Sequence, residues 1–218
     1  MRYITKRGSP QQFEDWKTQM GRRATYKDLS HKGSMHVKNV VKESLIDEQL
    51  GLCCYCGISI DAENVHIEHF IPQIDCPARQ LDYHNLHASC QGKKIHISQF
   101  EDELNFCGHS KGRWYDPQLT VSPLDPECEK YFLYGYDGTM EAQPGNVAAV
   151  ETIRRLGLDT YLPTILRKAA IDAVLSSIDL SDPDTSEIDS WISFFQTPQS
   201  NNLPSFSYII IQVLQSLK

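Results

Sequence analysis

Apolar residues recur at helical spacing near both ends of this 218-residue chain. Two helices are expected in the first fifty residues, over 11–20 and 35–50. In the second, one face is apolar and carries Val40, Val41, Leu45, Ile46 and Leu50. Gly51 follows directly and is expected to end this helix just before the first cysteines.

From about residue 147 the pattern is again helical. A short helix is expected around 186–196, together with two longer amphipathic helices. Their apolar positions are Leu162, Ile165, Leu166, Ala169, Ala170, Ala173, Val174 and Ile178 in the first, and Phe206, Ile209, Ile210, Val213, Leu214 and Leu217 in the second. Upstream of them, aromatic residues flank Asp137-Gly138, a pattern typical of a β-hairpin.

Residues 53–116 lack this periodicity. They are rich in cysteine, glycine and turn residues, and they contain six of the eight histidines, at positions 66, 69, 84, 87, 96 and 109. This composition indicates a region organised around ligands instead of an apolar core.

Composition sets the class of protein. With 40% hydrophobic residues, the chain can bury one good core, or a modest core with a small appended domain. The N-terminal sequence MRYITKRGSPQQ has no apolar segment typical of a signal peptide, and no apolar run is long enough to span a bilayer. A cytoplasmic protein is therefore expected, and its seven cysteines are expected to be metal ligands or free thiols.

Charge is distributed unevenly along the chain. The formal net charge is −7, yet residues 1–43 contain ten Lys and Arg against four Asp and Glu, which gives +6 there and −13 in the remainder. Because local potential steers a polyanion more than total charge does, this basic segment is suited to contacting nucleic-acid phosphates. A solvated basic surface is the alternative interpretation.

The cysteine spacing indicates a metal site. Cys53 and Cys56 form a C-x-x-C pair, in which a tight turn can present two thiolates to one tetrahedral ion. Cys90 and Cys107 are the candidates for completing a structural zinc site, because a glycine follows each within two residues and permits a close turn. Their wide separation resembles a zinc knuckle opened by an insertion at 96–106. The rival ligands are Cys54, Cys76 and His87, whereas Cys128 is expected to be simply buried.

These cysteines belong to a longer ordered set of residues. The set consists of the Cys53 and Cys56 pair, Glu68-His69-x-x-Pro72, Asn85-Leu86, Cys90, and Cys107-Gly108-His109-x-Lys111. Its order resembles the motif of the HNH nuclease family. The resemblance implies a ββα-metal fold, in which a β-hairpin and a helix surround one divalent cation and a structural zinc holds the unit together.

The resemblance also implies roles for individual residues. His69 matches the general base that takes a proton from the attacking water, and Asn85 matches the residue that orients this histidine through hydrogen bonds. Glu68 and His109 match the ligands of a catalytic Mg²⁺ or Mn²⁺, which polarises the scissile phosphate. Lys111 is a candidate phosphate contact. The implied reaction is phosphodiester hydrolysis that leaves a 5′ phosphate and a 3′ hydroxyl.

Two positions depart from the family pattern. Glu68 and His69 would point to opposite faces of a regular strand, so both reach one phosphate only if the strand ends or bends there. The family's third residue usually follows its cysteine directly, whereas here Gly108 occupies that place and His109 follows it. His66 shares a strand face with Glu68 and is therefore the rival metal ligand.

The resemblance extends beyond the motif residues, and four longer segments are similar to PtuB, the HNH nuclease family of Septu antiphage systems, including retron-associated ones. They are QLGLCCYC (49–56), IEHFIP (67–72), SPLDPECEKYFLYGYDGTM (122–140) and ETIRRLGLDTYLPTILRKAAI (151–171). This resemblance implies a PtuA-like ATPase partner, in retron-associated systems a reverse transcriptase with its DNA, and a role as a defence effector.

The expected protein is α+β, with a basic helical arm (1–50), a zinc-stapled ββα-metal nuclease core (51–145) and a C-terminal helical region (146–218). A zinc-stabilised nucleic-acid-binding module and a protein-interaction adaptor, both without catalysis, are the alternatives. His69 and Asn85 favour the enzyme, because neither alternative needs those side chains. Whether the substrate is DNA or RNA stays open. The remaining histidines, His31, His36, His84 and His96, are expected at the surface.

Overall fold

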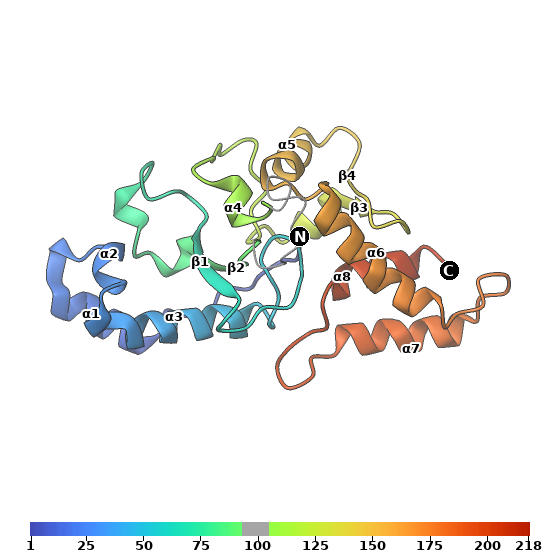
Figure 1. Cartoon of the computed structure of the whole chain (residues 1–218), viewed down its shortest axis with the longest axis horizontal. Helices are drawn as coiled ribbons and strands as arrows, with labels where there is room; N and C mark the ends of the chain where they lie inside the picture. Colours follow the sequence, from blue (N-terminus) through green and yellow to red (C-terminus); the bar gives the residue numbers. More distant parts are fainter. Residues whose placement is uncertain (93–104) are drawn as a thin grey trace, which may run out of the picture.

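The computed structural model describes residues 1–92 and 105–218 (Figure 1). This part of the chain combines α-helices with two separate two-stranded antiparallel sheets, which confirms the expected α+β class. Most of the insertion expected at 96–106, with His96, lies outside the described residues. None of the helices within the described ranges is both long and apolar enough to cross a bilayer.

The hairpin and the helices expected from periodicity are confirmed, and they correspond to α1, α3 and α5–α8 below. The α-helices of the described residues are α1 (Gln11–Met20), α2 (Tyr26–Leu29), α3 (Met35–Glu48), α4 (Gly108–Lys111), α5 (Val147–Leu156), α6 (Tyr161–Leu175), α7 (Thr185–Gln196) and α8 (Ser207–Gln215). The strands are β1 (Val65–His69), β2 (Leu86–Cys90), β3 (Phe132–Tyr134) and β4 (Met140–Ala142). Strand β1 pairs with β2, and β3 pairs with β4 across the turn at Asp137-Gly138.

Helix α3 leads the chain into the cysteine-rich region. It ends at Glu48, and Leu50 and Gly51 then adopt the left-handed conformation, with φ of 53° and 71°. A left-handed residue is common at the end of a helix, and glycine adopts it without steric cost. The chain therefore turns sharply here and reaches Cys53 beside the first sheet.

The N-terminal segment packs against α3 and the first sheet. Its buried apolar side chains join a cluster that continues through α3, β1 and β2, and they are Met1, Ile4, Phe13, Trp16 and Leu29. The Lys6 ammonium donates to the Glu48 carboxylate at 2.6 Å and also to the Leu86 carbonyl, and both charged side chains are buried. Removing one partner of a buried ion pair leaves an uncompensated buried charge, so these contacts fix the chain at Lys6 to α3 and β2.

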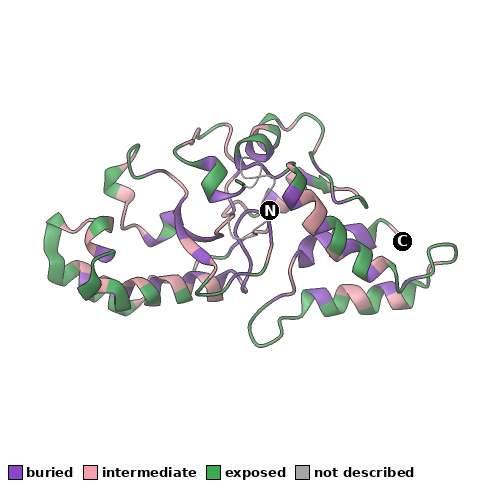
Figure 2. Cartoon of the chain, in the orientation of Figure 1, coloured by how far each residue is buried: buried purple, intermediate pink, exposed green. Residues whose placement is uncertain are grey.

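A second apolar cluster joins α6, α7 and α8. Its buried members include Ile171, Ile188, Ile209 and Leu214, which come from all three helices. In Figure 2 the buried residues concentrate around β1, β2 and α8, whereas α1 and α7 carry long exposed stretches. The helical periodicity at the end of the chain is therefore explained by packing within this second cluster.

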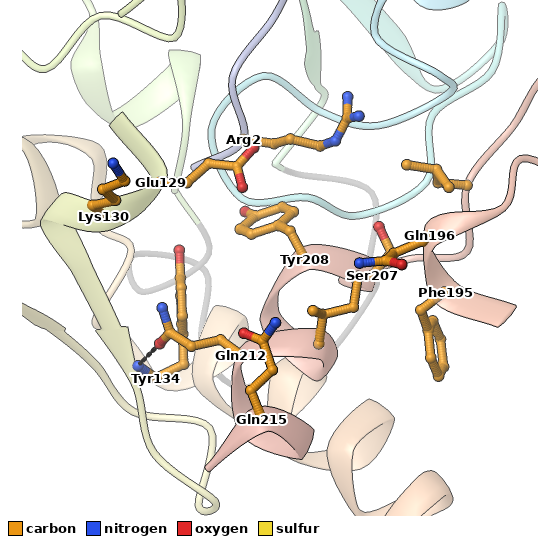
Figure 3. A pocket seen from close by; sticks show the side chains of 12 residues that line it. Arg2, Glu129, Lys130, Tyr134, Phe195, Gln196, Ser207, Tyr208, Gln212 and Gln215 are labelled. Carbon is orange, nitrogen blue, oxygen red and sulfur yellow. Dashed lines mark hydrogen bonds between the residues drawn. The ribbon is translucent and has the colours of Figure 1, made fainter. Parts of the chain in front are cut away.

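A cavity of about 390 Å³ lies between the second sheet and the helices α7 and α8 (Figure 3). The Gln212 side chain in its wall accepts a hydrogen bond from the Tyr134 backbone N–H at 2.9 Å and donates one to the Phe132 carbonyl at 3.1 Å. These bonds fasten α8 to β3. None of the site residues expected from the sequence lines this cavity.

The β1–β2 hairpin positions the residues of the HNH-like motif. His66 lies opposite Ser89, Glu68 opposite His87, and His69 opposite Leu86. Because side chains alternate along a strand, His66 and Glu68 share one face with their partners on β2. The short helix α4 covers this face: its Gly108 backbone N–H donates to the Ser89 hydroxyl at 3.4 Å.

Candidate active site and metal centre

The four cysteines expected to hold zinc lie together in the structure. Cys53, Cys56, Cys90 and Cys107 are all buried, and their sulfur atoms lie within 4.8 Å of one another. The Sγ–Sγ distance is 3.8 Å both for Cys53 with Cys107 and for Cys56 with Cys90. A tetrahedral Zn²⁺ with Zn–S bonds of about 2.3 Å separates its sulfur ligands by about 3.8 Å. The sulfur positions therefore fit a zinc ion.

Three separate segments deliver these sulfur atoms. Cys53 and Cys56 lie in the turn after α3, where the Cys53 backbone N–H donates to the Ile58 carbonyl at 2.9 Å. Cys90 ends β2, and its N–H donates to the Cys53 sulfur at 3.3 Å. Cys107 precedes α4, with its N–H bonded to the Leu156 carbonyl at 2.7 Å. A metal ion at this cluster would join the α3 turn, the hairpin and α4.

The rival zinc ligands lie outside the cluster. Cys54 is buried beside it, with its N–H bonded to the Ala88 carbonyl at 3.1 Å, and Cys76 is half-buried in the loop after β1. His87 is fully buried, and burial lowers its pKa well below the ordinary value, so its ring is neutral. Cys128 is buried as expected.

Glu68 is a buried carboxylate with different partners on its two oxygens. Oε1 accepts hydrogen bonds from the Lys111 ammonium at 2.8 Å and from the Tyr55 hydroxyl at 3.3 Å, whereas Oε2 lies 3.4 Å from Nε2 of His66. Burial raises the pKa of Glu68, but His66 and Lys111 outweigh this effect and bring the pKa below its ordinary value. Glu68 is therefore ionised at neutral pH and can hold a cation.

Lys111 does not occupy the position expected of a phosphate contact. Its side chain is buried, and its ammonium bonds to Glu68 and, at 3.0 Å, to the His69 carbonyl. This lysine holds α4 against the end of β1 and offsets the buried negative charge.

His69 is held in one ring orientation by the loop that follows β1. Its Nε2 lies 3.0 Å from the Gln80 carbonyl, and its Nδ1 lies 3.3 Å from the Gln73 side-chain amide. Because a carbonyl only accepts hydrogen bonds, Nε2 carries the proton and Nδ1 carries the lone pair in the neutral ring. The Tyr26 ring packs edge-on at 4.5 Å, and burial lowers the pKa of His69 below its ordinary value. The structure thus favours a neutral imidazole with a basic Nδ1.

Asn85 supports the loop that follows β1 but does not bond to the His69 ring. Its side-chain carbonyl accepts from the Ile71 N–H at 2.8 Å, and its amide donates to the carbonyls of Ile71 at 3.0 Å and Arg79 at 3.2 Å. Within the described residues it makes no hydrogen bond to the His69 ring, so direct orientation of that ring by Asn85 is not what the structure contains. Asn85 instead shapes the segment whose Gln80 carbonyl holds His69.

Glu68 and His69 open into the same pocket. Strand β1 ends at His69, and the chain then turns away, so the two neighbouring side chains are not separated by a continuing sheet. The pocket measures about 330 Å³, and its lining residues are Ile67, Glu68, His69, Pro72, Gln73, Ile74, Gly112 and Arg113. Arg113 is exposed and forms no ion pair within the described residues. The pocket therefore combines a carboxylate, a neutral imidazole and an available cation.

His109 and His66 lie next to each other near Glu68. His109 is exposed on α4, and its ring packs edge-on against the His66 ring, with 4.9 Å between the ring centroids. His66 is half-buried on β1 and lies 3.4 Å from the Glu68 carboxylate. Of the two imidazoles, His66 contacts the Glu68 carboxylate directly, and His109 contacts the His66 ring. The histidines His31, His36 and His84 are exposed as expected.

Several residues of the site were missed from the sequence. Gln73 and Gln80 contact the two nitrogens of His69, Tyr26 packs against its ring, and Arg113 lines the pocket. Only Gln73, next to Pro72, and Arg113, just after Lys111, lie close enough to the motif for sequence to have suggested them. Tyr26 carries no local signal.

Comparison with known proteins supports the HNH interpretation at low sequence identity. No protein-family model matches the chain. The chain is similar to a protein of Vibrio cholerae serotype O1 biovar El Tor that bears the name Retron Vc95 putative HNH endonuclease, with 25% identity over 138 residues. The match covers 62% of this chain and 62% of the length of that protein. The similarity agrees with the ordered motif and with the hairpin and short helix that carry it.

Proposed function

We propose that this protein is a metal-dependent HNH endonuclease that hydrolyses phosphodiester bonds of nucleic acid. The observation that carries the proposal is the shared pocket, in which the Glu68 carboxylate and the neutral His69 imidazole lie side by side at the end of β1. The similarity to the protein named Retron Vc95 putative HNH endonuclease supports the same reaction.

His69 is the general base in this proposal. Its Nδ1 accepts a proton from the water that attacks phosphorus, and the exposed Gln73 amide yields its place to that water. The Gln80 carbonyl keeps accepting from Nε2–H and stabilises the imidazolium that forms. His69 thus needs no carboxylate partner.

Glu68 supplies the cation site. A bound Mg²⁺ or Mn²⁺ would stabilise the charge that develops on the scissile phosphate and on the leaving 3′ oxygen. Lys111 and Tyr55 fix Oε1 of Glu68 and leave Oε2 as the ligand atom. Arg113 at the pocket is placed to bind a substrate phosphate.

The four-cysteine cluster is proposed to hold a structural zinc. Four thiolates form a closed coordination shell with no position for water or substrate, which suits a structural and not a catalytic ion. The cluster lies at the base of both β2 and α4, so zinc would hold together the two elements that carry the site.

The biological setting is proposed by similarity alone. A PtuA-like ATPase, and in a retron system a reverse transcriptase with its DNA, are the proposed partners in an antiphage defence complex. Whether DNA or RNA is cut is left to the assay.

A cleavage assay tests the proposal. Wild-type protein, alone and with a co-purified partner, is incubated with DNA and RNA pools in Mg²⁺ or Mn²⁺. Products with 5′ phosphates are expected, and EDTA should abolish them. Glu68→Gln, which keeps the shape of the side chain but removes its charge, should lower the cleavage rate at least about 100-fold. Cleavage that persists in EDTA, or at the wild-type rate in this variant, would contradict the proposal.

A non-catalytic nucleic-acid-binding module is the second candidate, favoured by exposed cations in the basic N-terminal segment. Arg22, Arg23 and Lys27 are exposed and form no ion pair within the described ranges 1–92 and 105–218. Lys27 adjoins Tyr26, whose ring contacts His69 and whose N–H donates to the Gln80 side chain at 3.0 Å. Lys27 therefore follows directly on a residue that contacts His69, as expected for either a binder or a nuclease.

Neutralising this surface is expected to weaken nucleic-acid binding. The variant Arg22→Ala/Arg23→Ala/Lys27→Ala should lose roughly tenfold or more in affinity at moderate salt, with a shallower dependence of log K on log salt, because fewer counterions are released. Fluorescence anisotropy at several salt concentrations measures both quantities.

A matched control removes three cations that have partners in the C-terminal region. Arg154 and Arg155 bond to Glu151, and Lys168 bonds to Asp172. Their triple alanine variant has the same change in net charge and should bind almost as wild type. Equal loss in both variants would mean that total charge, and not the exposed cations of the N-terminal segment, governs binding. Binding without cleavage in every metal tested would favour the non-catalytic module.

A further inference from the structure

We propose that His66, and not His109, is the second protein ligand of the divalent cation held by Glu68, and that Gly108 is required to keep the two ligand atoms accessible. The inference rests on the proposed function, since it concerns the same cation, but it is tested by metal binding and not by cleavage.

The positions of His66 and Glu68 follow from the strand that carries both. They are two residues apart on β1 and therefore project from the same face. Nε2 of His66 lies 3.4 Å from Oε2 of Glu68. Two adjacent ligands of an octahedral ion, each about 2.1 Å from it, are separated by about 3 Å. A small closure of these two side chains is enough for them to share one ion.

In the part of the chain that the structure describes, the other contacts of His66 and Glu68 do not involve the two proposed ligand atoms, Nε2 of His66 and Oε2 of Glu68. Lys111 and Tyr55 bond to Oε1 of Glu68, so Oε2 is the oxygen that faces His66. Nδ1 of His66 is buried and has no hydrogen-bond partner within the described residues. The contact between Nε2 and Glu68 is thus the polar contact of this imidazole within the described residues. An imidazole that binds a cation through Nε2 carries its ring proton on Nδ1.

Gly108 lies against both ligand atoms. A Cβ added to it would lie 2.6 Å from Oε2 of Glu68 and 2.6 Å from Nε2 of His66. These distances are far shorter than any ordinary non-bonded contact. The backbone of Gly108 is helical and does not itself demand glycine, so the requirement comes from the space beside the two atoms. Any side chain here would push apart the pair that holds the ion.

His109 lies on α4 and not on the strand that carries His66 and Glu68. Its side chain is exposed, and its ring packs edge-on against the His66 ring. This contact can hold the His66 ring in position. The geometry points to His66 as the ligand, because its Nε2 already faces the carboxylate from the same strand.

Binding of Mn²⁺ to non-cleaving protein tests the inference. In a His69→Ala background, the affinity for Mn²⁺ is measured by the loss of the free Mn²⁺ electron paramagnetic resonance signal. Added His66→Ala or Gly108→Ala should each weaken binding at least tenfold, whereas added His109→Ala should weaken it less than threefold. Zinc content and the melting temperature show that each variant is folded.

A conservative replacement provides a second measurement. His66→Gln keeps an uncharged ligand atom on the same face of β1 as Glu68. This variant should bind Mn²⁺ more tightly than the His66→Ala protein does. A matched His84→Ala variant, at an exposed histidine outside the site, should bind as the parent does.

The outcomes separate the inference from the proposed function. If His66→Ala leaves Mn²⁺ binding unchanged and His109→Ala removes it, His66 is not the ligand, yet the metal-dependent nuclease stands. If the parent protein fails to bind Mn²⁺ and wild-type protein fails to cut in it, both the inference and the proposed function are overturned.

Discussion

Replacing His69 with alanine is expected to lower the rate of phosphodiester cleavage by about 10²- to 10⁴-fold, the usual contribution of a positioned general base. The expectation follows from the ring geometry. The Gln80 carbonyl holds Nε2–H, and Nδ1 presents its lone pair next to the pocket that Glu68 also lines. No other imidazole of the described residues lines this pocket. Single-turnover cleavage with saturating Mn²⁺ measures the effect on the chemical step.

Two controls distinguish loss of the base from loss of structure. The His69→Ala protein should keep its zinc content and bind nucleic acid as wild type does, because it retains all the cations proposed to contact phosphate. The matched variant His84→Ala removes an exposed histidine from the same connection between β1 and β2, and it should cleave normally. A His69→Ala protein that cuts at the wild-type rate would exclude His69 as the base.

The same histidine gives a pH dependence with a defined sign. The base works only as the neutral ring, so cleavage falls as the pH drops through the pKa of His69. Burial lowers this pKa below the ordinary value. The cleavage rate should therefore fall at a lower pH than it would if the base were an exposed histidine. A profile of single-turnover rates from pH 5 to 8 measures it, with the metal concentration kept saturating at each pH.

Sequence periodicity was sufficient for much of the fold. The helices α1, α3, α6, α7 and α8 were expected because apolar residues repeat at a spacing that gives each helix one buried face. The turn at Asp137-Gly138 was expected because these residues tolerate the backbone of a tight hairpin. Both patterns involve residues close together in the sequence, so they can be recognised without knowledge of tertiary contacts.

The site was only partly accessible from sequence, for a physical reason. The four cysteines could be grouped because their chemistry is specific and few alternatives exist. The hydrogen-bond partners of His69 and Asn85 could not be predicted. They include backbone carbonyls of the loop 70–85, and the residue types do not specify the path of this loop. Likewise, the role proposed for Gly108 depends on His66 and Glu68, which lie on a strand far earlier in the chain.

The basic N-terminal segment is a further case in which the sequence does not reveal the tertiary partners of its side chains. Its charge suggested a single phosphate-binding surface, but its cations have different environments. Lys6 is buried against Glu48, and Arg7 bonds to Asp47, whereas Arg22 and Lys27 are exposed without ion pairs in the described structure. Net charge along a sequence does not reveal which cations are already neutralised by acids elsewhere.

Removing the metal from the cysteine cluster is expected to have the largest effect on stability. A structural zinc contributes on the order of 10–16 kcal/mol in small zinc domains, which equals or exceeds the total stability of a typical domain, about 5–15 kcal/mol. The Cys53→Ser variant should therefore lose bound zinc and unfold cooperatively at a much lower temperature, or fail to accumulate as soluble protein. Metal analysis and circular dichroism melting measure the two effects.

Cys76→Ser is the matched control, because Cys76 is a half-buried thiol outside the cluster. It should keep one zinc per chain and change the free energy of unfolding by less than about 0.5 kcal/mol. Where Cys53→Ser is too unstable to purify, a strong chelator added to wild-type protein gives the same comparison. A metal-free protein with an unchanged melting curve would show that the cluster needs no ion.

Loss of zinc should also remove catalysis, because a series of contacts connects the cysteine cluster through α4 to Glu68. Cys107 directly precedes α4, and Ser89 contacts both the Cys53 sulfur at 3.8 Å and the Gly108 N–H. Helix α4 in turn carries Lys111, whose ammonium holds Oε1 of Glu68. Once the sulfur atoms separate, α4 is no longer fixed to the hairpin, and Glu68 loses the partners that turn Oε2 toward the cation. Chelation of zinc should therefore abolish cleavage even when Mn²⁺ is supplied in excess, whereas removal of Mn²⁺ alone should leave the fold intact.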